Sequence, residues 1–442
     1  MMKHAIPFLA VLCWLVPLAA HAATKVQEVV TPLGFRAWLV EEHSLPLVAI
    51  QLSFAGSGSA YDPKGLEGRA NMVAALLMEG AGDMNSTAFN QALESRAIRL
   101  NVGVDEDSLG LILEALSESK EEAFGYMAMA ATAPRFDDDA IERVRSQSLT
   151  VLKQQSQNPG YKAHRAWQQL AFGEHGYGQP AVGTPTSLPA LERSDLKNFA
   201  ANYLTRQNLL IAASGDITPE ELSKLIDKHL GALPANYSPD KRLDEVMLPP
   251  GGGKPTIITT DIPQTIVRFG LQGLKRDDPQ YFTAHVMNHI LGGAGLTSKL
   301  SAEIREKRGL AYSVQTYMNP LSRGAAWMGG FSTRNEKAGE AIAALEKTLR
   351  DFTQQGVSAT ELADAKRYLT GSFILSLDSN TAITQFLISM QENKLGIDYF
   401  DKRNALVEAV TAEGVKAMAT RLLPPGLIMV LVGKPQIAPA GQ

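Results

Sequence analysis

The chain has 442 residues, of which 45% are apolar and 20% are charged, and its formal net charge is −4. This length is enough for two or three domains with full-size cores. No basic block is present, which argues against nucleic acid as a partner, and no second apolar stretch of spanning length follows the N-terminal one.

Residues 1–22 are typical of a secretory signal peptide. Lys3 gives a positive start, residues 5–18 form a short apolar run, and Ala20-His21-Ala22 matches an A-x-A cleavage site. The only cysteine, Cys13, lies in this segment, so we expect a mature chain without disulfides or thiolate zinc sites. These features favour export to a bacterial periplasm, with no membrane span after cleavage. An uncleaved membrane anchor is the alternative.

The clearest boundary in the mature chain is the segment 237–254, YSPDKRLDEVMLPPGGGK. It is polar, contains consecutive prolines and glycines and shows no sustained periodicity, which is typical of a linker. It separates a domain at 23–236 from a domain at 255–437, each of ordinary domain size. The glycine run, residues 251–253, is compatible with a hinge.

The two domains end with the same pattern. Residues 196–217 and 415–435 each predict an amphipathic helix, a short turn and an apolar strand closed by glycine. Long helical patterns precede them, at 140–155 and 361–376. Repetition over this length indicates a duplicated domain. A chance similarity of two helix–strand units is the alternative.

Strands and helices are mixed within each half. Further strands are predicted at 35–41, 47–54, 108–113 and 209–214. Capping boxes predict helices that begin after Thr218 and Ser358. We therefore expect an α+β fold of two homologous domains, each a mainly antiparallel sheet with helices packed on one face. The acidic run at 105–107 is interpreted as a solvated turn.

In the second domain, residues 291–314 read LGGAGLTSKLSAEIREKRGLAYSV, a glycine-rich turn before a helix that ends at Gly309 and leads into a strand. This segment resembles the signature of the insulinase-type (M16) metallopeptidases, in the small-subunit branch that includes the mitochondrial and bacterial processing peptidases. The resemblance extends from about residue 27 to 435. It implies two α+β domains that face each other across a chamber, in agreement with the repeat.

Active members of the family bind zinc through His-x-x-Glu-His on a helix of the first domain. The two histidines share one helix face, and the Glu serves as base for the zinc-bound water. The resemblance places Asn71, Ala74 and Ala75 at the first His, the Glu and the second His. We therefore expect no zinc in this chain. The helix itself is kept by its apolar stripe, Met72, Val73, Leu76 and Leu77.

The family's second domain supplies an Arg and, seven residues later, a Tyr that face the zinc. The matching residues are Arg305 and Tyr312. The resemblance implies that the Arg holds substrate carbonyls and the Tyr donates a hydrogen bond to the developing oxyanion. In the alternative, Arg305 makes a surface ion pair and Tyr312 packs in the core. The turn glycines Gly292, Gly293 and Gly295 are candidate substrate-binding residues.

One histidine pair has ligand spacing, His285 and His289, with Asn288 at the family's Glu position. It lacks a general base and lies in the domain that bears the Arg and the Tyr. We interpret the pair as partly buried or cleft-lining residues, with a displaced zinc site as the alternative. His164 and His175 are interpreted as polar surface groups.

The resemblance implies a zinc-free subunit of a periplasmic heterodimeric M16 metallopeptidase, inactive alone. A homologous partner subunit would carry the zinc, and this chain would offer Arg305 and Tyr312 in trans for peptide hydrolysis. A non-catalytic binding or scaffold protein with the same fold is the alternative, and an autonomous peptidase using His285 and His289 is a third possibility. The sequence specifies neither the substrate peptide nor whether the partner is a separate protein or a second copy.

Overall fold

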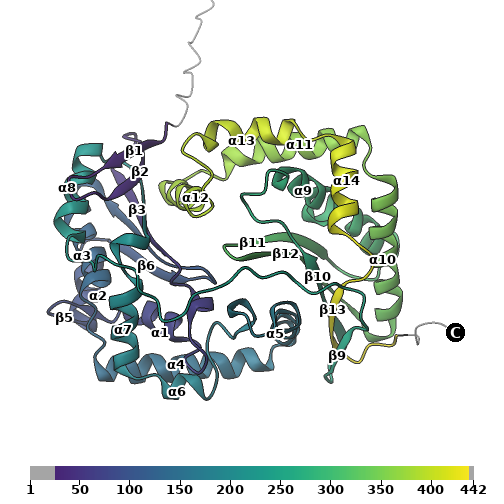
Figure 1. Ribbon diagram of the computed structural model, residues 1–442, viewed down its shortest axis with the longest axis horizontal. Helices are drawn as coiled ribbons and strands as arrows, with labels where there is room; N and C mark the ends of the chain where they lie inside the picture. Colours follow the sequence, from purple (N-terminus) through teal and green to yellow (C-terminus); the bar gives the residue numbers. More distant parts are fainter. Residues whose placement is uncertain (1–24, 438–442) are drawn as a thin grey trace, which may run out of the picture.

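The computed structural model describes residues 25–437, which form two α+β halves connected by an extended segment (Figure 1). The predicted signal peptide, with Cys13, lies outside the described residues. Within residues 25–437, no helix combines the length and the apolarity that crossing a membrane requires.

The first half is built on a six-stranded sheet in the order β1-β2-β8-β3-β7-β6. Only the β2–β8 pair is parallel among the paired strands of this sheet as described. The strands are β1 (Gln27–Val30), β2 (Arg36–Glu41), β3 (Leu47–Ala55), β6 (Arg99–Val104), β7 (Ser108–Leu116) and β8 (Leu209–Gly215), and a small hairpin adds β4 (Gly80–Ala81) and β5 (Met84–Asn85). The helices are α1 (Arg69–Leu76), α2 (Ser86–Glu94), α3 (Lys120–Thr132), α4 (Asp138–Gln157), α5 (Pro159–Phe172), α6 (Ser187–Ala190), α7 (Arg193–Tyr203) and α8 (Pro219–Leu230).

The second half repeats this plan on a five-stranded sheet in the order β11-β12-β10-β13-β9. Its strands are β9 (Thr256–Thr259), β10 (Gln264–Gln272), β11 (Val314–Leu321), β12 (Gly324–Arg334) and β13 (Ile428–Gly433). Its helices are α9 (Tyr281–Asn288), α10 (Ala338–Gln355), α11 (Ala359–Leu375), α12 (Asn380–Glu392), α13 (Tyr399–Glu408) and α14 (Ala412–Leu422).

The strand order confirms the predicted duplication. The order β2-β8-β3-β7-β6 of the first sheet corresponds to β9-β13-β10-β12-β11 of the second, and the pair formed with the last strand of each half, β2–β8 and β9–β13, is parallel in both. The predicted chain ends appear as α7 followed by β8 and as α14 followed by β13. Both sheets are otherwise antiparallel among the described strand pairs, as expected for an α+β fold.

The two predicted capping boxes are present. The Thr218 hydroxyl accepts from the Glu221 amide at 3.3 Å, and the Glu221 carboxylate accepts from the Thr218 amide at 3.0 Å. Ser358 and Glu361 make the same reciprocal pair at the start of α11. Each box satisfies amide groups that have no partner inside the helix, which fixes where α8 and α11 begin.

Each sheet is covered on its second face by a helix from the other half (Figure 1), a feature that the sequence did not predict. Helix α5 of the first half packs on β13 and β10, and α12 of the second half packs on β8 and β3. Trp167 of α5 is fully buried, and its indole N–H donates to the carbonyl of Ile428 at 3.1 Å. A Cβ at Gly270 would lie 2.4 Å from the indole ring, so this close contact requires glycine.

The reciprocal helix α12 uses polar contacts as well. The side-chain amide of Gln391 donates to the carbonyl of Ile211 at 3.1 Å, and the Ser53 hydroxyl donates to the Glu392 carboxylate at 2.7 Å. Burial raises the pKa of Glu392, although this hydrogen bond lowers it. The exchange of α5 and α12 therefore joins the halves through both an apolar and a polar interface.

The acidic run at 105–107 also belongs to the junction. Its interpretation as a solvated turn holds for the exposed Asp105 but not for Glu106 and Asp107, which are partly buried. The Asp107 carboxylate accepts from the Ser322 amide at 2.8 Å and from the Tyr177 hydroxyl at 2.6 Å, which connects the two halves. Burial raises the pKa of Glu106. The run carried no signal of this burial, because its partners are far away in the sequence.

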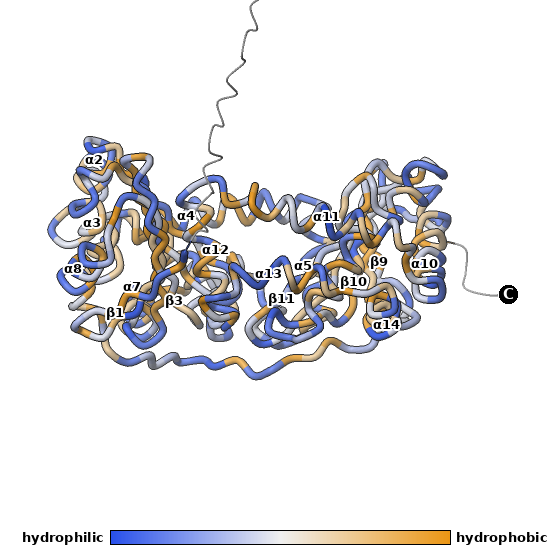
Figure 2. The backbone as a smooth tube through the Cα atoms, turned by 90° about the horizontal axis from the view of Figure 1, so that it is seen from above, coloured by the Kyte–Doolittle hydropathy of each residue, from blue (hydrophilic) through white to orange (hydrophobic). Residues whose placement is uncertain are grey.

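The connecting segment runs along one side of the molecule from one half to the other (Figure 2). It contains no helix or strand between α8 and β9 in the described chain, and it is fastened to the second half. The Val246 amide donates to the carbonyl of Arg323 at 2.8 Å. A Cβ at Gly426 would lie 2.2 Å from the Cα of Gly252. These glycines permit backbone-to-backbone packing, so the structure does not support the expected hinge at this point.

We predict that Trp167→Ala will lower the free energy of unfolding by about 3–5 kcal/mol, because it opens a cavity between the two halves and leaves the Ile428 carbonyl without its donor. Urea unfolding followed by circular dichroism measures this loss. Leu170→Ala on the same helix is the control, since Leu170 is 42% exposed and its loss should cost no more than about 0.5 kcal/mol. Equal effects of the two substitutions would contradict the role given to Trp167.

Candidate functional site

Helix α1 carries the three positions where zinc ligands and a base would stand. Asn71 is half-buried and its side-chain amide donates to the carbonyl of Ala181 at 2.8 Å. Ala74 is buried and Ala75 is exposed. An amide that is already engaged and two methyl groups offer no ligand set for zinc. The predicted apolar stripe is buried in the core of the first half, namely Met72, Val73, Leu76 and Leu77.

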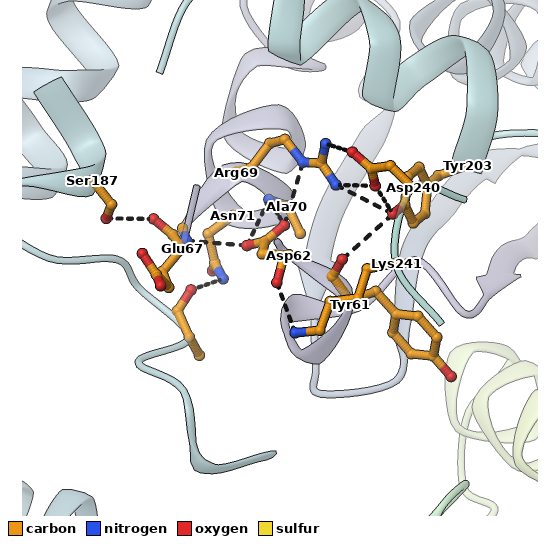
Figure 3. A network of polar contacts seen from close by, with 12 residues as sticks. Tyr61, Asp62, Glu67, Arg69, Ala70, Asn71, Ser187, Tyr203, Asp240 and Lys241 are labelled. Carbon is orange, nitrogen blue, oxygen red and sulfur yellow. Dashed lines mark hydrogen bonds and ion pairs between the residues drawn. The ribbon is translucent and has the colours of Figure 1, made fainter. Parts of the chain in front are cut away.

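The start of α1 is fixed by the buried carboxylate of Asp62 (Figure 3). This carboxylate accepts from the Gly68 amide at 3.0 Å and from the Ala70 amide at 3.1 Å. Gly68 has φ 91° and packs against the backbone of Gly183, where a Cβ would come within 2.9 Å of the Cα. The glycine before the helix is therefore explained by conformation and packing.

An ion-pair network connects this helix to the segment that links the halves (Figure 3). Arg69 is 1% exposed and donates to both carboxylate oxygens of Asp240, at 2.8 and 3.0 Å. Its Nε lies 3.6 Å from Asp62, and the Tyr203 hydroxyl also donates to Asp240. The ammonium of Lys241 donates to the carbonyl of Asp62 at 2.8 Å. No local sequence pattern indicates this network, since its carboxylates come from distant segments.

Asp62 is the buried carboxyl group of this network. Burial raises its pKa to about 7, while the nearby Arg69 guanidinium and the two backbone amides lower it. The pKa of Asp240, which is half exposed, is lowered because the hydrogen bonds from Arg69 and Tyr203 outweigh its partial burial. Arg69 therefore compensates two carboxyl groups at once.

The glycine-rich turn of the second half packs against β11. A Cβ at Gly292 would lie 2.4 Å from the hydroxyl of Thr316, and one at Gly293 would lie 2.8 Å from the side-chain amide of Asn288. Gly295 has φ 57°, which favours glycine. Packing and conformation thus account for all three glycines, and their predicted contact with substrate stays a prediction.

Arg305 and Tyr312 lie side by side after this turn. Arg305 is in a π-helical segment, Ser301–Glu306, and its guanidinium carbon lies 5.7 Å from the centroid of the Tyr312 ring. Tyr312 is 87% exposed and lies two residues before β11, in the short connection between the π-helical segment and the strand. The Arg305 side chain makes no hydrogen bond or ion pair with another residue of the described chain. The structure therefore shows neither the ion pair nor the core position of the alternative interpretation.

Tyr312 also borders a hollow of about 550 Å³ on the second sheet. The polar and charged side chains around it include Arg268 of β10, Arg334 of β12 and Tyr317 of β11. No hydrogen bond within residues 25–437 joins Arg305 or Tyr312 to the degenerate positions of α1. The structure thus brings Arg305 and Tyr312 together and places Tyr312 at the border of a basic hollow.

The histidine pair of α9 has surroundings that oppose a metal ion. His285 stacks on Tyr281 with ring centroids 6.0 Å apart, and burial together with the nearby Arg403 and Arg276 lowers its pKa to about 4. His289 stacks on Tyr368 at 4.9 Å. Two arginines beside His285 repel a divalent cation. No group of three or more metal-ligating residues occurs in the described part of the chain.

Asn288 is the centre of a buried hydrogen-bond network. Its side-chain oxygen accepts from the indole N–H of Trp327 and from the hydroxyl of Thr316, each at 2.8 Å. His164 and His175, which were expected at the surface, are partly buried near the junction of the halves. Burial and the Arg268 charge lower the pKa of His164 to about 4, so it is neutral near pH 7.

Comparison with known proteins agrees with this architecture. The model of the insulinase family, peptidase family M16, matches residues 38–185, and the model of the peptidase M16 inactive domain matches residues 190–369. The chain belongs to the M16 family. A crystal structure described as a peptidase M16 inactive domain from Pseudomonas fluorescens has a TM-score of 0.86 and 28% identity, with 94% of this chain and 98% of that chain covered.

Two M16 relatives have contrasting names. A Helicobacter pylori protein named non-peptidase homolog YmxG is 30% identical over 364 residues, covering 80% of this chain and 82% of its own. A Mycobacterium tuberculosis protein named as an uncharacterized zinc protease is 24% identical over 413 residues, covering 92% of this chain and 93% of its own. The M16 assignment is therefore secure, and the residues of α1 distinguish this chain from a zinc-binding member.

We predict that Arg69→Met will lower the free energy of unfolding by about 3–5 kcal/mol near pH 8, because it leaves the buried Asp62 and the half-exposed Asp240 without their cation. The loss should be smaller at pH 5. The folded-state pKa of Asp62, about 7, lies above its unfolded-state value, so this group makes folding less favourable as pH rises from about 4 to 7. Removing Arg69 raises the folded-state pKa of Asp62 further, and the pH range over which Asp62 destabilises the fold extends upward.

Urea unfolding at pH 5 and pH 8 measures both quantities. Arg36→Met is the control, since Arg36 is 71% exposed and pairs only with the surface residue Glu28 at 3.0 Å. An equal loss at the two pH values for Arg69→Met would show that Asp62 and Asp240 do not carry the effect.

Proposed function

We propose that this chain is the zinc-free subunit of a heterodimeric M16 peptidase of the periplasm. In this proposal it is inactive alone and supplies Arg305 and Tyr312 to a homologous, zinc-bearing partner that hydrolyses peptides. The observation that carries the proposal is the pairing of an 87% exposed tyrosine with an arginine that has no carboxylate partner among residues 25–437, in a chain whose own α1 has no zinc ligands.

The chemistry of the pair fits attack of a zinc-bound water on a peptide carbonyl. The Tyr312 hydroxyl can donate a hydrogen bond to the oxygen on which negative charge develops, and Arg305 can donate to neighbouring carbonyl oxygens of the peptide. Both side chains would stabilise the tetrahedral intermediate through hydrogen bonds alone, and neither would give up or take up a proton. Water activation requires a zinc site and a general base, which the partner would hold.

A non-catalytic scaffold is the second candidate, favoured by the name of the Helicobacter pylori relative, non-peptidase homolog. Such a protein has no need for an exposed tyrosine beside an unpaired arginine. The exposed side chain of Tyr312 contributes nothing to the core. Its exposure therefore supports a role in contact with another molecule. We give preference to the subunit proposal on this ground.

Affinity capture of the tagged mature protein from its native periplasm is expected to recover a chain of similar size that carries His-x-x-Glu-His. Mass spectrometry identifies that chain, and metal analysis should find about one zinc per pair, since a catalytic M16 site holds a single ion. A solitary, metal-free protein would favour the scaffold. A solitary protein that carries zinc would redirect attention to His285 and His289.

In the reconstituted complex, Tyr312→Phe is expected to lower peptide turnover by roughly 10²–10³-fold, the usual consequence of losing one oxyanion donor. Assembly, measured by size-exclusion chromatography, should be unchanged because the hydroxyl is exposed. Tyr368→Phe is the control, since Tyr368 is also exposed, at 61%, and lies on α11. Unchanged turnover in Tyr312→Phe would refute the role of the hydroxyl.

A further inference from the structure

The hollow beside Tyr312 opens on the face of the second sheet that is turned toward the first half. Gly270 and Arg268 alternate by two along β10, so their side-chain directions share one face of the sheet. That face is the one on which Trp167 of α5 packs, as the contact with Gly270 shows. Helix α5 covers β13 and β10 (Figure 1). The strand residues that line the hollow belong to β10, β12 and β11.

The floor of the hollow is lowered by a glycine. In the strand register, Arg268 of β10 and Gln315 of β11 both lie opposite Gly330 of β12. A Cβ at Gly330 would lie 3.4 Å from Nη1 of Arg268, so the guanidinium extends over the position where a side chain would stand. The missing side chain thus gives the guanidinium of Arg268 its place above β12, on the side of the strand that Gln315 flanks.

The hollow is positively charged. Arg268 and Arg334 line it, and no Asp or Glu belongs to the described residues that line it. Arg334 has only a weak surface partner, Glu336, whose carboxylate lies 3.6 Å away. The remaining polar lining consists of neutral groups, including Tyr312, Tyr317 and Gln264. His164, near Arg268, is neutral and adds no further positive charge.

Arg268 has no counter-charge within residues 25–437. Its Nε is buried without a hydrogen-bond partner, and its guanidinium pairs with no carboxylate in the described chain. A partly buried cation without a counter-charge is costly, so its retention calls for a compensating group from outside. A guanidinium fork matches a carboxylate in a bidentate arrangement.

We propose that this hollow binds a carboxylate of the peptide that enters between the two halves, with Arg268 and Arg334 as specificity-determining residues. The ligand is thus an acidic peptide, whose carboxylate is either an Asp or Glu side chain or the C-terminal group. The inference deepens the proposed function and rests on it only in taking the ligand to be a peptide. Because Tyr312 lies at the rim of the hollow, the bound carboxylate would be close to the peptide carbonyl to which Tyr312 and Arg305 donate hydrogen bonds.

The test measures binding of fluorescent peptides to the purified mature chain by anisotropy, without partner, zinc or turnover. One pair of peptides differs only by an internal Glu or Gln and has an amidated C-terminus. A second pair has no acidic side chain and differs only by a free or amidated C-terminus. Wild-type protein should bind the carboxylate member of one pair about tenfold or more tightly, as expected for charge-assisted hydrogen bonds, and the pair that responds identifies the source.

Arg268→Gln and Arg334→Gln should each reduce this preference, and the double variant should abolish it. Arg268→Lys should retain part of it, because the charge remains and the fork is lost. Arg350→Gln on α10, with the same change of charge at an exposed site, is the control and should leave the preference intact. Arg268→Gln should not lower the melting temperature, since it removes an unpaired cation.

Equal affinity of wild-type protein for both members of both pairs would overturn the proposal, and so would a preference that survives the double variant. If Arg268→Gln proves unstable, Arg334→Gln decides alone, because Arg334 is more than half exposed and its substitution does not affect folding. Failure of this test leaves the turnover test of Tyr312→Phe intact. Absence of a zinc-bearing partner, in turn, leaves carboxylate binding unaffected.

Discussion

The exchange of one helix between the two halves determines the arrangement of the rest of the protein. Trp167 of α5 fits against Gly270 of the second sheet, and α12 covers the first sheet in return. Neither sheet would have both faces buried without the other half, so the halves stabilise each other through their cores. This differs from domains joined only by a linker, for which relative motion is the default. It also determines which part of the second sheet remains open to form the basic hollow.

In the first half, helix α1 is present although it lacks the residues of the zinc motif. The side chains of Met72, Val73 and Leu76 of α1 are buried, and Arg69 at its start neutralises two carboxyl groups, one of them on the segment that connects the halves. Close packing constrains the identity of the apolar residues, and the high cost of an unpaired buried charge constrains Arg69. Asn71 and Ala75 are not part of that core. The ligand positions are thus free to change while the helix is not.

Helix α9 occupies in the second half the place that α1 has in the first, yet its polar residues serve different ends. Asn288 satisfies the buried indole of Trp327, whereas His285 lies among aromatic rings beside two arginines. Arg268 is the opposite case, a cation that no residue of the described chain satisfies. A residue that lowers stability and has no structural partner is the kind that function retains. The contrast separates structural polar groups from those available to a ligand.

The sequence by itself determined the α+β class, the duplication and the loss of the zinc ligands. These features are written in local patterns, such as the capping boxes at Thr218 and Ser358, the repeated helix–strand ends and the residues at 71, 74 and 75. It also placed Arg305 and Tyr312 close to each other, because a short stretch of chain separates them.

Only the tertiary structure decided what pairs across large separations. Three hydrogen bonds, from Asp107 to Ser322, from Arg69 to Asp240 and from Trp167 to Ile428, join segments that are far apart in the chain. No local sequence pattern relates the two partners of any of these bonds. The same holds for the isolation of Arg268, since a missing counter-charge appears only when every neighbour is in place. Hydrophobic and capping signals repeat along the chain, whereas compensation of a buried charge depends on which distant segments meet.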